Sequence, residues 1–282
     1  MKDRRFAPFL APLALTRPRQ WVPYLGLPVL GVLSACDFSI RSLGPVLLWC
    51  VFYLSGGYAF NGACDAGGDF PEKNVVARGE WSRRAAFVFS LSLFFAAALL
   101  AFALPERTRF LALAMIALGI FYSLPHVGLK RLPFVGTLSN VGLFVPLYWI
   151  GRGALPEAAA GDFWAAAFLA LPSLQSQLIH EAQDQEEDGR AGTRTTARAL
   201  GLQRIPLAVQ GISVFILLGA SLAVWQEAFP HYAAFAFGIA SFTGLIGEGA
   251  REFPLWRRRT RRAYMAACLV WVAQLAFECR VS

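Results

Sequence analysis

Long runs of apolar residues, separated by short polar loops, cover most of the 282-residue chain. A membrane helix needs roughly 20 apolar residues, because the hydrocarbon layer is about 30 Å thick. The pattern predicts nine spans, several of them short for this task, near residues 21–40, 43–61, 85–104, 110–124, 133–150, 163–179, 205–225, 232–247 and 264–277. We therefore expect an all-α fold, a polytopic membrane bundle of about nine transmembrane helices forming one domain over residues 1–282.

Composition supports this class. Hydrophobic residues make up 56% of the chain, with 24 Phe and 8 Trp, which is too apolar for a soluble domain of this size. The five cysteines show no CxxC spacing, so the sequence predicts neither a zinc site nor a disulfide framework. We interpret them as small core residues.

The N-terminal segment allows a second interpretation. The stretch LSACD around Cys36 is similar to the sites at which lipoprotein signals are cut. A second basic cluster, Arg17 and Arg19, precedes the apolar run and would make the leader unusually long. We therefore interpret this segment as the first helix of the bundle.

The basic residues are unevenly distributed between alternate loops. With a cytoplasmic N-terminus, the inside segments hold 21 of the 26 Lys and Arg residues, and the outside segments hold five. Cytoplasmic loops normally carry this excess, so we expect the N-terminus inside and the C-terminus outside the cytoplasmic (inner) membrane. The anionic inner membrane surface accounts for the net charge of +8. The chain has no basic stretch interleaved with aromatic residues, the pattern that would indicate nucleic-acid binding. No obligate protein partner is implied either.

Two acidic triplets follow apolar spans on the predicted inner side. In NGACDAGGD, the residues Asn61, Asp65 and Asp69 recur every four positions and share one helix face. Carboxylates held at membrane depth predict a functional site, and oxygen-only ligands suit a hard cation such as Mg²⁺. The sequence therefore predicts a cation site at the end of the second span.

The second triplet lies in HEAQDQEED after the sixth span. Glu181, Asp184 and Asp188 also share one helix face, whereas Glu186 and Glu187 are expected to face water. One such stripe alone is more often a solvated face or part of a salt-bridge network. Two stripes on the same membrane side favour a shared metal site for an anionic ligand.

A third polar element, YSLPHVGLKR, connects the fourth and fifth spans. Pro125 ends the helix, and Lys130 and Arg131 then place cations on the same side as both stripes. Such residues can simply set membrane orientation. Beside two metal-binding stripes, however, an ammonium is also the group that a diphosphate needs.

The three motifs together resemble those of the UbiA-type intramembrane prenyltransferase superfamily, in order and in helix position, and the resemblance covers nearly the whole chain. Departures are Glu181 in place of the first Asp of the second motif, His126 where many members have Pro, and Ala77-Arg78-Gly79 where an Arg-Pro pair often follows the first motif. His180 is not part of the family pattern.

The resemblance implies a reaction and roles for named residues. Asn61, Asp65 and Asp69 would bind one Mg²⁺, and Asp184 and Asp188, assisted by Glu181, a second. Both would hold the diphosphate of a polyprenyl donor, whose allylic group moves to a hydrophobic, aromatic acceptor, as in quinone or related lipid biosynthesis. Groups expected to contact the diphosphate are Lys130, Arg78, Lys73, Arg194 and Tyr122. Aromatic candidates beside the allylic cation are Phe60, Phe121, Phe144, Tyr148 and Trp149.

Two other functions stay open. A terpene cyclase of the same fold would capture the cation with the donor's own double bonds, so that the product forms without an acceptor. An ion-coupled transporter would carry cations through intramembrane carboxylates, but it typically has related halves with interrupted helices near the midplane. The sequence has no such repeat, and its acidic residues cluster at one face.

Overall fold

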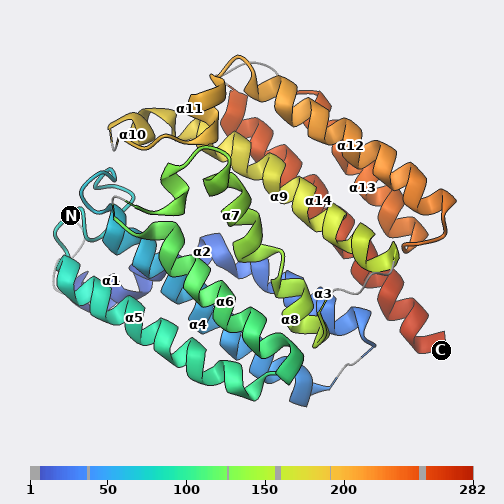
Figure 1. Ribbon diagram of the computed structural model, residues 1–282, viewed down its shortest axis with the longest axis horizontal. Helices are drawn as coiled ribbons and strands as arrows, with labels where there is room; N and C mark the ends of the chain where they lie inside the picture. Colours follow the sequence, from blue (N-terminus) through green and yellow to red (C-terminus); the bar gives the residue numbers. More distant parts are fainter. Residues whose placement is uncertain are drawn as a thin grey trace.

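The computed structural model describes residues 7–36, 39–125, 127–155, 160–190, 192–247 and 252–281. Within these ranges the regular structure is helical and contains no strand. The long helices run roughly along the long axis of the molecule and pack side by side (Figure 1). The all-α bundle expected from the apolar pattern is confirmed.

The helices are as follows. The first half contains α1 (Ala7–Thr16), α2 (Pro18–Trp21), the 3-10 turn η1 (Val22–Leu25), α3 (Gly26–Ser34), α4 (Ile40–Asp65), α5 (Arg83–Leu100), η2 (Ala101–Ala103), α6 (Glu106–Ser123), η3 (Leu129–Arg131), α7 (Val135–Phe144) and α8 (Leu147–Arg152). The second half contains α9 (Ala160–Gln183), α10 (Gln185–Arg190), α11 (Thr196–Leu200), α12 (Ile205–Trp225), α13 (His231–Leu245) and α14 (Phe253–Val281).

Within the described ranges, three helical stretches are long and apolar enough to cross a membrane by length and composition, namely Ile40–Asp65, Arg83–Ala103 and Ile205–Trp225. Each expected span overlaps helical segments, but the ends differ and the count of nine membrane helices is not confirmed. The first expected span, 21–40, contains η1 and the short α3 rather than one long helix. The fifth is divided at Pro146 into α7 and α8, because proline cannot donate the backbone hydrogen bond that a continuous helix needs. The last helix starts at Phe253 rather than near residue 264, so the arginine-rich stretch expected as a loop is helical.

Local sequence signals set several helix ends. Ser39 and Ser82 cap α4 and α5, their hydroxyls accepting from the amides of Ser42 and Ala85 at 3.2 and 3.1 Å. Helix α6 ends at Ser123, two residues before Pro125, as the sequence predicts.

Aromatic side chains fill the interior on both halves of the bundle. Trp164, Phe168, Phe237 and Trp271 belong to one buried cluster, which joins α8, α9, α12, α13 and α14. A second cluster around Trp49 joins α4, α5 and α6. Large apolar side chains also remain exposed on the outer helix faces, as expected for surfaces that meet lipid.

Helices α3 and α8 approach each other closely through two glycines. A Cβ at Gly31 would lie 1.9 Å from the carbonyl oxygen of Tyr148, and one at Gly151 would lie 2.0 Å from that of Pro28. Any side chain at either position would force the helices apart. This contact fixes the start of the chain against its middle.

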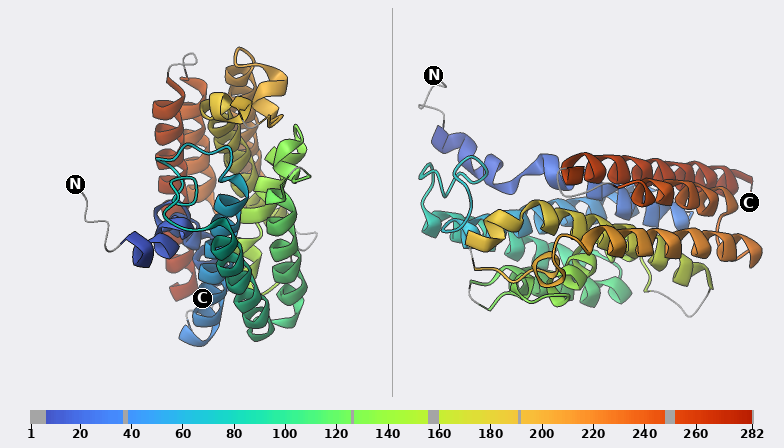
Figure 2. Two further views of the ribbon diagram at one scale, coloured as in Figure 1. Left: turned by 90° about the vertical axis from the view of Figure 1, so that its left-hand side faces the viewer. Right: turned by 90° about the horizontal axis from the view of Figure 1, so that it is seen from above.

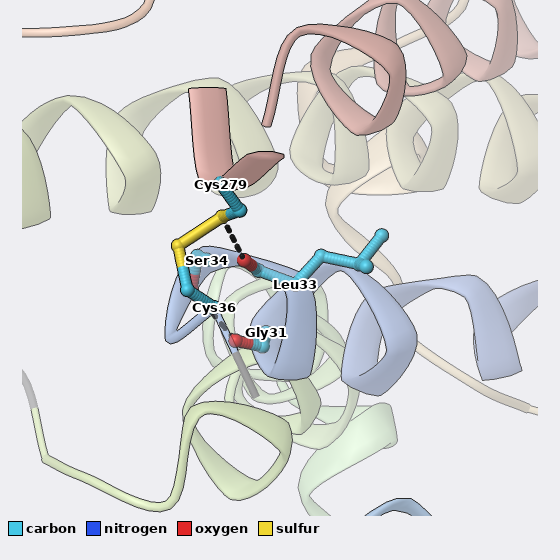
Figure 3. Close-up of a disulfide and its surroundings, with 5 residues drawn as sticks. All are labelled: Gly31, Leu33, Ser34, Cys36 and Cys279. Carbon is cyan, nitrogen blue, oxygen red and sulfur yellow. Dashed lines mark hydrogen bonds between the residues drawn. A yellow bond between two sulfur atoms is a disulfide. The ribbon is translucent and has the colours of Figure 1, made fainter. Parts of the chain in front are cut away.

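Two of the five cysteines form a disulfide, so the expectation that all are isolated core residues is wrong. Cys36, just after α3, is bonded to Cys279 near the end of α14, with Cα atoms 5.5 Å apart (Figure 3). Their separation of 243 residues explains why spacing rules did not detect the pair. Cys50 and Cys64 are buried and free, and Cys268 is free and half-buried.

The polar connections gather at one end of the bundle. The loop after α4, the segment around η3, and α10 with α11 lie together at that end, where α1 also lies, whereas α14 finishes at the opposite end (Figure 2). We call the end with the polar connections the acidic end. The opposite end, which holds Cys36 and Cys279, is called the disulfide end.

Candidate metal and diphosphate site

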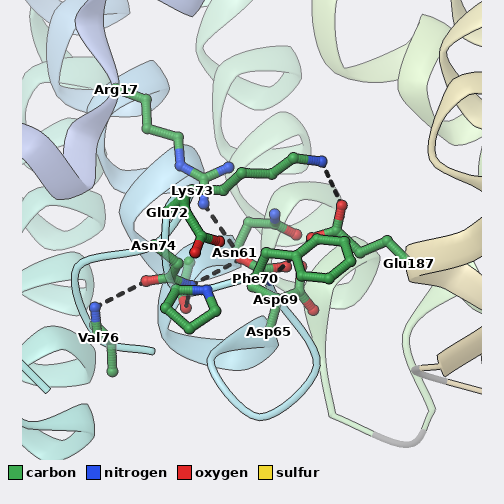
Figure 4. Close-up of polar contacts among 12 residues, drawn as sticks. Arg17, Asn61, Asp65, Asp69, Phe70, Glu72, Lys73, Asn74, Val76 and Glu187 are labelled. Carbon is green, nitrogen blue, oxygen red and sulfur yellow. Dashed lines mark hydrogen bonds and ion pairs between the residues drawn. The ribbon is translucent and has the colours of Figure 1, made fainter. Parts of the chain in front are cut away.

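The first acidic stripe starts on the last turns of α4 and continues beyond it. Asn61 and Asp65 are in the helix, and Asp69 follows in a turn. The backbone amide of Asp69 still donates to the carbonyl oxygen of Asp65 at 2.9 Å. The helical repeat therefore extends far enough to keep the three polar side chains near one another, as Figure 4 shows.

Lys130 of η3 contacts this stripe directly. Its Nζ donates to both carboxylate oxygens of Asp65, at 2.5 and 2.6 Å, and to Oδ1 of Asn61 at 2.8 Å. The hydroxyl of Ser123, at the end of α6, donates to the same Asn61 oxygen at 3.0 Å. An ammonium thus lies where the amide and carboxylate oxygens converge, and the third polar motif joins the first.

Asp69 has a different set of partners. Nδ2 of Asn74 donates to it at 2.8 Å and Nη2 of Arg17 at 3.3 Å. The same Asn74 nitrogen also donates to the carbonyl oxygen of Gly62 at 2.8 Å, and Asn74 is buried. Burial raises the pKa of the Asp69 carboxyl, and the hydrogen bond from Asn74 opposes that rise.

Glu181 is the most enclosed acid of the second stripe. Its Oε1 accepts from Thr137 at 2.7 Å and from Gln177 at 3.2 Å, and its Oε2 accepts from the amide of Ala197 at 3.1 Å. Thr196 extends the network, since its hydroxyl contacts that of Thr137 at 2.5 Å. The carboxylate therefore joins α7, α9 and α11.

Asp184 and Asp188 are more accessible. Asp184 contacts Nζ of Lys73 at 3.4 Å and Nδ1 of His180 at 3.1 Å. Asp188, in α10, has its pKa raised to about 7 by burial and then by the neighbouring carboxylates of Asp184, Glu181 and Glu187. Carboxylates held so close together are stabilised by a cation placed between them.

Glu187 does not face water as expected. Its side chain is 13% exposed, its Oε1 accepts from the amide of Phe70 at 3.2 Å, and its Oε2 pairs with Lys73. Figure 4 shows Lys73 reaching towards Glu187 from the loop after α4. Glu186 does face solvent, pairing with Arg190 at 2.6 Å. The Glu187 contacts hold the loop of the first stripe against the helix of the second.

The remaining expected diphosphate contacts are scattered. Arg78 pairs with Glu80 at 2.9 Å and donates to the carbonyl oxygens of Pro71 and Glu72. It makes no described hydrogen bond to either stripe. Arg194 is exposed in the turn before α11, and Tyr122 is half-buried one residue before Ser123.

The expected aromatic candidates also differ in position. Phe60 is buried beside Asn61, with Phe87 and Phe94 at its edge. Phe144 stacks on Tyr24 with ring centroids 4.0 Å apart. Tyr148 and Trp149 are buried in the core, whereas Phe121 is 57% exposed on the outside of α6.

The donor set is compatible with Mg²⁺ that is shared with a phosphate ligand. No three His, Cys, Asp or Glu residues within the described ranges converge as a complete metal cage. Mg²⁺ does not require one, because one or two carboxylates with waters and phosphate oxygens usually suffice. The ammonium groups of Lys130 and Lys73, which contact Asp65 and Asp184, occupy positions where such a cation would interact with the same carboxylate oxygens.

Sequence reasoning missed Arg17, Asn74 and Glu187. Arg17 and Glu187 contact partners 52 and more than 100 residues away, so no local spacing indicates them. Asn74 lies only five residues after Asp69, and an amide so near a buried carboxylate could have been considered.

Comparison with known proteins agrees with this arrangement. Residues 22–276 match the UbiA prenyltransferase family. A lycopene elongase/hydratase from Haloarcula japonica is 34% identical over 203 residues, covering 67% of this chain and 66% of that protein. A 4-hydroxybenzoate octaprenyltransferase from Albidiferax ferrireducens is 25% identical over 280 residues, covering 93% of this chain and 88% of that protein.

Solved structures share the fold. A UbiA homologue from Archaeoglobus fulgidus bound to GPP and Mg²⁺ has a TM-score of 0.76 at 17% identity, covering 94% of this chain and 99% of that chain. The structure of a digeranylgeranylglyceryl phosphate synthase has a TM-score of 0.74 at 13% identity, covering 95% and 98%. The family match, over residues 22–276, includes both acidic stripes and Lys130.

Proposed function

Because the chain belongs to the UbiA prenyltransferase family, we propose that it transfers a polyprenyl group from a prenyl diphosphate to a hydrophobic acceptor in a Mg²⁺-dependent reaction. The observation that carries this proposal is the meeting of the two acidic stripes and Lys130 at one end of the bundle. Asn61, Asp65 and Asp69 would hold one Mg²⁺, and Asp184 and Asp188 a second.

Glu181 has a separate place in the proposal. Sequence groups it with the second set of ligands, but its carboxylate already accepts three hydrogen bonds. It would assist that site chiefly by holding α9, α7 and α11 in position. Oxygen lone pairs left over by these bonds remain available to a cation.

The lysines would exchange partners when the donor binds. Mg²⁺ bound to the carboxylates would neutralise the diphosphate and favour its departure. Lys130 would move from Asp65 to the phosphate oxygens, and Lys73 would do the same from Asp184. Arg194 and Tyr122 complete the expected contacts, and Arg78 would join them after leaving Glu80. Preorganised charge of this kind is worth several kcal/mol of barrier, about 10²–10³ in rate for each group.

The bond changes follow from the donor. Cleavage of the allylic C–O bond leaves its electron pair on the diphosphate and produces an allylic cation. An electron pair of the acceptor forms the new bond, and the acceptor then loses a proton. Phe60, next to Asn61, lies near the acidic end and would offer an aromatic face to the cation. The stacked pair of Phe144 with Tyr24 lies at the end of α7 away from η3 and would offer further aromatic contact. Tyr148 and Trp149 lie deeper, and Phe121 would have to rotate inward.

The relatives support two different classes of hydrophobic acceptor, an aromatic compound and a polyene. We expected an aromatic acceptor, which the resemblance to a 4-hydroxybenzoate octaprenyltransferase supports. The relatives that include the Haloarcula protein are lycopene elongase/hydratases, which supports a polyene instead. Both acceptors can offer π electrons to an allylic cation.

The test is product analysis with purified protein, Mg²⁺ and a prenyl diphosphate. 4-Hydroxybenzoate, lycopene or no acceptor is added in parallel, and EDTA removes the metal in a control. A prenylated acceptor that forms only with Mg²⁺ is the expected result. A cyclised product without acceptor would identify a cyclase, and no consumption of any prenyl diphosphate would overturn the proposal.

We also propose that the acidic end faces the cytoplasm. The distribution of basic residues supports this orientation, and the disulfide supports it independently, because such bonds persist outside the reducing cytoplasm. In a background without other cysteines, Arg194→Cys should react with a membrane-impermeant thiol reagent only in opened cells. Arg107→Cys should react in intact cells, and the reverse pattern would contradict the orientation.

A further inference from the structure

Arg257 is a half-buried cation that pairs with no carboxylate among the described residues. It lies in the first turns of α14, at the acidic end. Among the described residues its side chain makes one hydrogen bond, from Nη1 to Oε1 of Gln183 at 3.3 Å. A guanidinium has five N–H donors and always carries charge, so most of its bonding capacity is unused.

The position of Arg257 places it beside the second stripe. Gln183 ends α9 and directly precedes Asp184. Arg257 lies in electrostatic range of the Asp184 carboxylate, and of Tyr24 and Tyr58 across the bundle. It therefore lies among α9, α14 and the N-terminal helices rather than on the outer surface.

Three cations at this end are each paired with a carboxylate. Lys130 is held by Asp65, Lys73 by Glu187 and Asp184, and Arg17 by Asp69. Each of these must release a carboxylate before it can bind an anion. Arg257 has nothing to release, and enclosing an unpaired charge is costly unless an anion pairs with it.

We propose that Arg257 binds the diphosphate of the donor directly, on the side of the Asp184 stripe. This inference rests on the proposed function. The planar guanidinium donates two parallel hydrogen bonds to phosphate oxygens, a geometry that an ammonium cannot reproduce. Gln183 orients the group by its single contact.

The alternative role of Arg257 is to set membrane orientation. In that case any neighbouring arginine would serve equally, since the positive-inside effect depends on number and not on exact position. Arg258 is adjacent on the same helix and is exposed. It provides a matched control with the same change of charge.

The experiment measures binding of inorganic pyrophosphate in the presence of Mg²⁺ by calorimetry, using full-length protein and Arg257→Gln, Arg257→Lys and Arg258→Gln. Loss of charged hydrogen bonds should weaken binding about 10- to 100-fold in Arg257→Gln. Arg257→Lys should lie in between, and Arg258→Gln within about twofold of the wild type, as for an exposed charge.

The outcomes separate this inference from the proposed function. Equal affinities in Arg257→Gln and Arg258→Gln, with an active wild type, overturn the role of Arg257 alone. A wild type that neither binds pyrophosphate nor consumes prenyl diphosphate overturns both. If Arg257→Gln does not fold, Arg257→Lys decides, because wild-type affinity in that variant contradicts the two-bond geometry.

Discussion

At the acidic end, side chains from α4, η3 and α10 hold the loops together by ion pairs, whereas at the disulfide end Cys36 and Cys279 join α3 to α14 covalently. Ion pairs can be exchanged for a metal or a phosphate, but a disulfide does not respond to a ligand. Exchangeable contacts are therefore concentrated where the proposed substrate binds. The opposite end keeps α3 and α14 together while those contacts change.

The sharpest test of the acidic end is Asp65→Asn. The substitution keeps the size of the side chain but removes the charge that holds Lys130 and would hold Mg²⁺. Turnover of prenyl diphosphate at saturating Mg²⁺ should fall by about 10- to 1000-fold. Glu186→Gln, which removes the charge of an exposed acid paired with Arg190, is the control and should stay close to wild type. More than a tenth of normal activity in Asp65→Asn would falsify the metal role.

Lys130→Ala should have the next largest effect. The ammonium contacts Asn61 and Asp65, so its loss should slow turnover and weaken donor binding by about 10- to 100-fold, as for removal of a preorganised charge. Arg131→Ala removes the adjacent cation, which contributes equally to membrane orientation. Turnover and sidedness are measured for both variants. Equal, mild losses would assign Lys130 to orientation alone.

The sequence predicted the helical bundle because the apolar runs are long and because lipid leaves helices as the simplest way to satisfy the backbone. It also placed Lys130 on the same membrane side as Asp65, since both follow spans that end there, but the direct contact between the two side chains was not predicted. The predicted helix ends were less accurate. The last helix begins at Phe253, before an arginine-rich stretch, and arginine is compatible both with a loop and with an exposed helix face.

What the sequence did not predict depends on distant partners. The contact of Glu187 with the amide of Phe70 arises only when the loop after α4 folds back over α10. The Cys36–Cys279 bond likewise requires the ends of α3 and α14 to be neighbours. No hydrophobic period carries that information, because it describes one helix at a time.

Glu187→Gln tests whether the loop after α4 must be held in place. Without its charge, Glu187 loses most of its attraction for Lys73 but keeps an acceptor for the Phe70 amide. We expect KM for the donor to rise by about two- to tenfold with a smaller change in kcat, because an ordering contact and not a reacting group is weakened. Faster amide exchange in residues 66–82 should accompany the change. Glu186→Gln, at an exposed pair, should alter neither quantity.

Cys36→Ser and Cys279→Ser should have the smallest effect on turnover and a clear effect on stability. The bond closes a loop of 243 residues at the end remote from the acidic stripes, so the reacting groups keep their positions. Disulfides typically contribute about 2–4 kcal/mol, which corresponds to a fall of about 5–10 °C in the thermal midpoint for a chain of this size. The two single variants and the double variant should unfold at the same temperature, because each breaks the same bond.

Reducing the disulfide of the wild type should lower its thermal midpoint to that temperature. Cys268→Ser, which changes a free thiol, should not lower it. Additive losses in the double variant would show that the two sulfurs stabilise the protein separately, and a fall in turnover matching that of Asp65→Asn would show that the two ends are not independent.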